Sequence, residues 1–79
     1  MLQKIDLSDA RKTMREFKDK DPDTYIELFI AGGYYSKKDV EHKLSAIEEA
    51  HPGWVTISSG YALEKGSTDL KAVVLHYKP

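Results

Sequence analysis

Apolar residues recur at helical spacing near the start of the chain, with charged residues between them. These apolar positions are Leu7, Ala10, Met14 and Phe17. Such spacing is typical of an amphipathic helix. Asp6 or Ser8 can cap its first turn, and Pro22 disfavours a helical conformation at the residue before it. The pattern therefore predicts a helix over residues 7–20.

The strongest local signal is the segment 35–40, which has the sequence Tyr-Ser-Lys-Lys-Asp-Val. Ser36 can accept a hydrogen bond from the amide of Asp39, and Asp39 can reach back to Ser36. Tyr35, before the cap, can pack on Val40. This capping box predicts a second helix over residues 37–50, which the following His-Pro-Gly sequence ends. Its core-facing residues are Val40, Leu44 and Ile47.

Segments rich in β-forming residues predict three strands, at residues 25–30, 54–63 and 70–77. Ala31-Gly32-Gly33 lets the chain turn after the first strand. Ser58-Ser59-Gly60 weakens the second strand, where a bulge or bend is expected. The last strand is apolar on both faces at its centre, which is typical of a strand covered on both sides.

The predicted fold class is α+β, with element order α-β-α-β-β and a mainly antiparallel three-stranded sheet. Short connections favour a hairpin of the second and third strands. The third strand is the most apolar, so it belongs in the middle, in spatial order 1-3-2. The result is a split β-α-β unit. The first helix is expected either beside the second helix or on the opposite face of the sheet.

Composition indicates one small globular domain that comprises residues 1–79. Hydrophobic residues make up 41% and charged residues 32% of the chain, and the net charge is −1. This charge does not favour nonspecific binding to nucleic acid or to anionic lipid. The chain has no cysteine and no apolar stretch of membrane-spanning length. We therefore expect a cytoplasmic protein without membrane association.

Two partial motifs resemble ion-binding or nucleotide-binding loops. Asp19, Asp21 and Asp23 alternate as at the start of a calcium loop, but the required glycine and glutamate do not follow. Residues 60–67 nearly spell a phosphate loop, but the lysine precedes the glycine and no helix is predicted after it. We expect neither site, and no cofactor.

A small-anion or ligand site is possible where the second helix begins. Gly32 and Gly33 precede this helix, and Lys37 and Lys38 lie in its first turn. Helix starts carry free amides and a positive dipole end, which together attract anions. The alternative interpretation is that the glycines only permit a turn and the lysines are solvated.

The chain shows no catalytic constellation. His42, His51 and His76 do not follow the spacing of a metal site, so we expect structural or surface roles for them. Ser58 and Ser59 lack an adjacent base in the sequence. We therefore expect no catalytic residues, no metal ligands and no enzyme activity.

Aromatic residues exceed what one inner face of a small sheet can cover, so some of them are expected at a binding surface. The predicted partner-binding residues are Tyr25, Phe29, Tyr34, Tyr61 and Tyr77. The favoured hypothesis is a non-enzymatic protein-binding or regulatory accessory domain that self-associates as a homodimer. Within this hypothesis, we expect an accessory protein, for example of a phage.

A nucleic-acid-binding module is the main alternative, with bases stacked on Tyr25, Phe29 or Tyr77 and lysines nearby. The net charge does not favour it.

Overall fold

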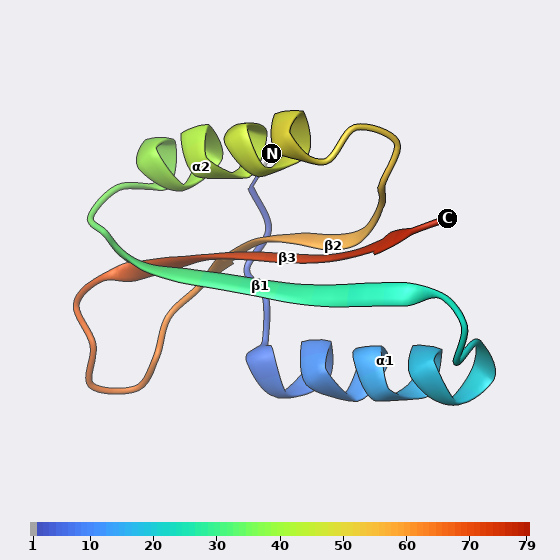
Figure 1. The fold of residues 1–79 in the computed structure, drawn as a ribbon. Coiled ribbons are helices and arrows are strands. Elements are labelled where there is room, and N and C mark those ends of the chain that lie inside the picture. The colour runs from blue at the N-terminus through green and yellow to red at the C-terminus, as the bar shows by residue number, and fades with distance from the viewer. Residues whose placement is uncertain (1) are drawn as a thin grey trace.

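Two helices and three strands follow one another in the predicted order, α-β-α-β-β (Figure 1). The fold is described from a computed structural model, which covers residues 2–79. The elements are α1 (Leu7–Lys20), β1 (Tyr25–Tyr34), α2 (Lys37–Ala50), β2 (Val55–Ala62) and β3 (Leu70–Lys78). Both helices match their predicted bounds, because their caps and end signals are local in sequence.

The sheet is antiparallel with strand order β1-β3-β2, which confirms the predicted position of the last strand. All residues of β3 from Ala72 to His76 are buried. Such a strand needs a neighbour at each edge for its backbone and a cover on each face for its side chains.

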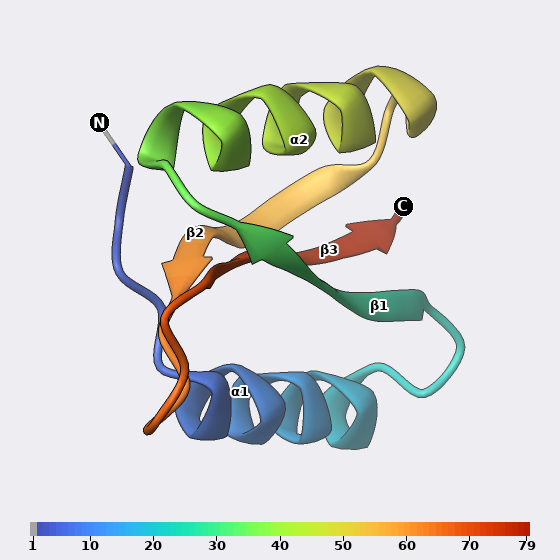
Figure 2. The same cartoon turned by 90° about the vertical axis from the view of Figure 1, so that its left-hand side faces the viewer.

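The helices supply these covers from opposite sides of the sheet, α2 above and α1 below in Figures 1 and 2. Successive side chains of a strand point to opposite faces. The ring of His76 lies 4.8 Å from that of His51 at the end of α2, whereas the ring of Tyr77 lies 4.9 Å from Phe17 of α1. Of the two expected positions for the first helix, the structure therefore has the opposite face.

Side-chain caps define where both helices begin. The Asp6 carboxylate accepts hydrogen bonds from the amides of Ser8 and Asp9, at 2.8 and 3.1 Å. Asp6, not Ser8, is therefore the cap of α1. Ser36 Oγ accepts from the amide of Asp39 at 3.2 Å, as predicted for the cap of α2. The predicted packing of Tyr35 on Val40 does not occur, because Tyr35 is 82% exposed.

The first strand is longer than predicted. Residues 25–30 were expected to form it, but β1 continues to Tyr34, which pairs with Leu70 of β3. The register shifts between Ala31 and Tyr34, and Gly33 has a φ of 91°. The glycines therefore form a bulge within the strand instead of the expected turn, because pairing with β3 outweighs their weak strand preference.

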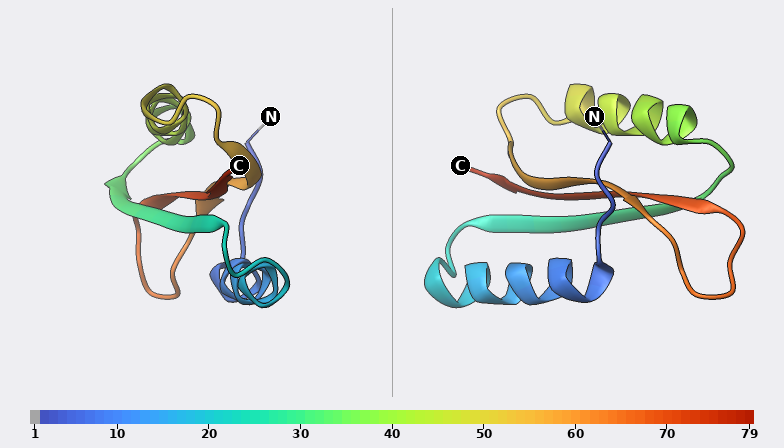
Figure 3. Two further views of the ribbon diagram at one scale, coloured as in Figure 1. Left: turned by 45° about the vertical axis from the view of Figure 1, so that its right-hand side comes forward. Right: turned by 180° about the vertical axis from the view of Figure 1, so that it is seen from behind.

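The N-terminal segment adds a short parallel pairing that the sequence pattern did not predict. The amide of Ile5 donates to the carbonyl of Tyr61 at 2.7 Å, and the amide of Tyr61 donates to the carbonyl of Gln3 at 2.9 Å. Figure 3 shows this segment crossing the edge of the sheet beside β2. A Cβ on Gly60 would lie 2.0 Å from the Gln3 carbonyl oxygen, so only glycine permits the approach. β2 has a bulge between Thr56 and Ser58, just before the predicted Ser58-Ser59-Gly60 segment, which itself pairs regularly with β3.

Loss of the Ser36 cap should destabilise the fold by about 1 kcal/mol, because Ser36→Ala leaves amides at the start of α2 without an acceptor. Denaturant melts measure this change. Ser45→Ala is the control, since Ser45 is an exposed residue within the same helix. That substitution should be neutral or slightly stabilising. Equal effects of the two substitutions would contradict the capping role.

Gly60→Ala should release the N-terminal segment from β2, because the added methyl group collides with the Gln3 carbonyl. Hydrogen exchange should then accelerate at the amides of Ile5 and Tyr61, which donate across this pairing. Ser59→Ala, one residue earlier in β2, should leave both amides protected. Unchanged protection in Gly60→Ala would show that the segment tolerates a side chain there.

Candidate functional site

The outer edge of β1 is the most extensive unpaired backbone in the sheet. β1 pairs with β3 on one side, and within residues 2–79 no strand pairs with its other side. It lies in front of β3 in Figure 1, with no segment across it. The opposite edge, formed by β2, is covered at one end by the N-terminal segment and interrupted by a bulge near the other.

The composition of β1 leaves this edge unprotected. Natural edge strands usually carry lysine, proline, an inward-pointing charge or a central bulge, which prevent pairing with another chain. The ten residues of β1 include no lysine or proline, and the one charged side chain, Glu27, lies 3.5 Å from His76 within the sheet, where the contact with that histidine offsets it as an edge-blocking charge. The bulge lies near its C-terminal end, so the run from Tyr25 to Ala31 is regular. This edge is therefore able to accept a further strand.

The predicted partner-binding aromatic residues do not form one patch. Tyr25, Phe29 and Tyr34 all lie on β1, and Tyr25 is 60% exposed. Tyr61 lies on β2, and Tyr77 packs against α1 on the opposite face. The rings of Phe29 and Tyr61 each lie near a lysine of α2: Phe29 lies 5.6 Å from Lys43 Nζ, and Tyr61 lies 5.0 Å from Lys37 Nζ. Three of the five residues thus follow the open edge.

The predicted anion site at Gly32 and Gly33 contains an anion from the chain itself. The amide of Gly33 donates to the Asp69 carboxylate at 2.7 Å. Lys37 extends toward Tyr61, and Lys38 is exposed in the first turn of α2. The Gly33 amide is therefore already bound to a carboxylate of the chain. This hydrogen bond connects β1 to the loop before β3.

Hydrogen bonds hold the pKa of Asp69 below its ordinary value. The Ser67 hydroxyl donates to the carboxylate, and this contact is the largest cause. The amide of Gly33 and the nearby Lys71 ammonium act in the same direction. Because the ionised carboxylate is the acceptor, the contact depends on its charge.

Asp69→Asn should lower stability at neutral pH and have less effect in acid. Because the pKa is lowered in the fold, the ionised group stabilises the fold fully above about pH 3.8, the pKa of a free aspartate. This contribution is lost as the pH falls through the native pKa. Thermal melts across this range test the prediction. Asp23→Asn, at an exposed loop position, should change stability little at any pH, and a pH-independent loss in Asp69→Asn would contradict the assignment.

A second site forms where three elements bring two histidines and a glutamate together. His76 of β3 lies directly opposite Glu27 of β1 in the sheet register. His51 ends α2, whose last turn lies above this part of β3. One possible ligand atom from each of the three residues lies within 4.8 Å of the others. We name Glu27, His51 and His76 the histidine cluster.

Hydrogen bonds and aromatic rings define the geometry of the histidine cluster. His76 Nε2 lies 3.5 Å from Glu27 Oε1, and His51 Nδ1 lies 2.7 Å from the carbonyl oxygen of Ile47. The Trp54 ring stands 4.6 Å from the His76 ring and 4.8 Å from the His51 ring. His76 is only 2% exposed, so its polar nitrogens depend on these neighbours.

Spacing along the chain indicated structural or surface roles for the three histidines. His42 is exposed on α2, but the other two converge with a glutamate that lies 49 residues from His76. The available signal was the position of His76, directly after the apolar residues Val73, Val74 and Leu75. A histidine in a strand buried on both faces requires a polar partner.

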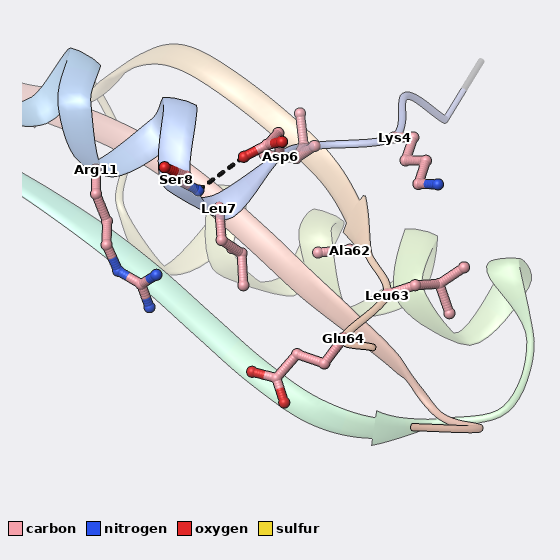
Figure 4. Close-up of a pocket in the computed structure, with 9 residues that line it drawn as sticks. Lys4, Asp6, Leu7, Ser8, Arg11, Ala62, Leu63 and Glu64 are labelled. Carbon is pink, nitrogen blue, oxygen red and sulfur yellow. Dashed lines mark hydrogen bonds between the residues drawn. The ribbon is translucent and has the colours of Figure 1, made fainter. Parts of the chain in front are cut away.

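A cleft of about 610 Å³ separates the start of α1 from the end of β2. Figure 4 shows charged side chains of both signs on its walls, among them Lys4, Arg11 and Glu64. The Asp6 carboxylate at its rim is engaged in capping α1. The walls therefore carry charges of both signs, and one of these charged groups already caps a helix. We do not assign a ligand to this cleft.

Comparisons with protein-family models, with curated proteins and with solved structures gave no match to this chain. Among residues 2–79, neither helix is long and apolar enough to cross a membrane.

Proposed function

We propose that this protein is a non-enzymatic protein-binding domain that functions as a homodimer, with β1 of one copy paired antiparallel to β1 of the other. The observation that carries the proposal is the unprotected outer edge of β1. Such an edge presents a row of amide and carbonyl groups that a second strand satisfies.

The symmetry of an antiparallel strand pair and the length of β1 both support a second copy of this chain as the partner. An antiparallel pair of identical strands has a two-fold axis, so each residue contact is made twice. Ten residues of β1 extend for roughly 34 Å, close to the longest dimension of the molecule, 37 Å. Pairing would give a six-stranded sheet with two helices on each face.

Side chains of β1 add to this backbone pairing. Tyr25, Phe29 and Tyr34 lie along the edge strand and would meet residues of the second copy across the new seam. Cross-strand aromatic pairs contribute roughly 0.2–1 kcal/mol each. The one charge on the strand, Glu27, is directed toward His76, so like charges need not meet at the seam.

The covered sheet supports protein binding over base stacking. A stacking platform requires an open sheet face with aromatic residues on it. Here α2 lies over one face and α1 over the other (Figure 2). Tyr77 packs on Phe17 of α1, whereas Tyr61 lies near Lys37 of α2, so the two tyrosines are on opposite faces. We propose that the domain has an accessory or regulatory role in the cytoplasm. A chain without cysteine is compatible with that reducing compartment.

Phe29→Lys should weaken the dimer, because it places a positive charge at the centre of the proposed seam. Sedimentation velocity over a wide range of protein concentration should show a monomer–dimer equilibrium for the unmodified chain. The substitution should shift that equilibrium toward monomer.

Tyr61→Lys is the matched control, since Tyr61 also lies near a lysine of α2 but belongs to β2. It should leave the dimer intact, and melts of both variants separate dissociation from unfolding. A monomer at every concentration would refute the proposal. Equal loss of dimer in two folded variants would show that the interface does not lie at β1.

A further inference from the structure

We propose that Glu27, His51 and His76 bind one divalent transition-metal ion of the zinc class. All three residues come from one copy of the chain, so the inference is independent of the proposed dimer. It rests on the donor types, their mutual distances and the hydrogen bonds that orient them.

The donor set selects the class of metal. Two imidazole nitrogens and one carboxylate oxygen suit zinc, cobalt, nickel and ferrous iron, whereas magnesium and calcium prefer oxygen ligands alone. Sites with three protein ligands of this kind keep a further position for water. Glu27, with a side chain that is 32% exposed, is the member of the cluster that reaches solvent, whereas His76 is buried.

The distances require only small side-chain movements. The three possible ligand atoms lie within 4.8 Å of one another. Donors around a tetrahedral zinc ion are separated by about 3.4 Å, as follows from metal–ligand distances near 2.1 Å. The backbone already holds the residues in place, because Glu27 and His76 are paired across the sheet. His51 is anchored by its own amide, which donates to Glu48.

Neighbouring groups orient the donors as metal sites require. His51 Nδ1 lies 2.7 Å from the Ile47 carbonyl, which can only accept. The Nδ1 atom therefore carries the proton, and Nε2 has the free lone pair that a metal binds. The second oxygen of Glu27 lies 3.4 Å from the Tyr25 hydroxyl, which donates to it. Metal-binding histidines and carboxylates usually have such partners.

Trp54 provides a reporter inside the site. It is the only tryptophan in the chain, and its ring lies 4.6 and 4.8 Å from the rings of His76 and His51. An open-shell ion such as Co²⁺ quenches indole fluorescence at this range, whereas closed-shell Zn²⁺ occupies the same ligands with little quenching.

The test is a titration of the full chain with Co²⁺, followed by Trp54 fluorescence and by visible absorption. We expect saturable quenching at one ion per chain, with visible bands of a cobalt ion held by nitrogen and oxygen donors. An excess of Zn²⁺ should reverse the quenching. No saturable quenching, or quenching that zinc does not reverse, would overturn the proposal.

Substitutions locate the ion. His51→Gln and Glu27→Gln should each weaken Co²⁺ binding by at least about tenfold, the smallest loss usual even for groups that only orient a ligand. His42→Gln, which alters the exposed histidine of α2, should leave the affinity unchanged. Circular dichroism without metal verifies that each variant is folded. Unchanged affinity in both cluster variants, or an equal loss in His42→Gln, would show that the ion binds elsewhere and overturn the proposal.

Discussion

Burial of β3 on both faces is the constraint on which the rest of the fold depends. From Ala72 to His76 every residue of this strand is buried. Its backbone groups require β1 and β2, and its apolar side chains require a helix on each side. His76 is the buried polar residue of this strand, and a desolvated imidazole requires a partner. The position of Glu27 directly opposite it meets that requirement.

Features encoded by neighbouring residues were predictable from the sequence. The capping box at Ser36 defined α2, and the apolar character of the last strand placed it at the centre of the sheet. Features that depend on tertiary pairing were not predictable. The glycines after Ile30 resembled a turn, yet they continue β1. The short segment of residues 3–5, Gln-Lys-Ile, gave no sign that it would pair beside Gly60.

The histidine cluster was hidden for the same reason. Its formation depends on the exact register of β1 against β3 and on where the last turn of α2 lies over the sheet. Neither quantity follows from spacing along the chain, because each is decided by packing of segments far apart in sequence. The open edge of β1 was easier to predict than the histidine cluster, because the predicted strand order already places β1 at an edge of the sheet.

The N-terminal segment beside β2 has a consequence for how far edge pairing can proceed. A sheet with two free edges can add copies indefinitely and grow into a fibre, whereas a sheet with one free edge is monovalent. In the described part of the chain, residues 3–5 cover one end of β2 and a bulge distorts the strand near the other. If β1 pairs with its counterpart as proposed, no regular edge remains in the described part of the chain. In the proposed dimer, these few residues at the start of the chain would thus limit assembly to a single pairing step.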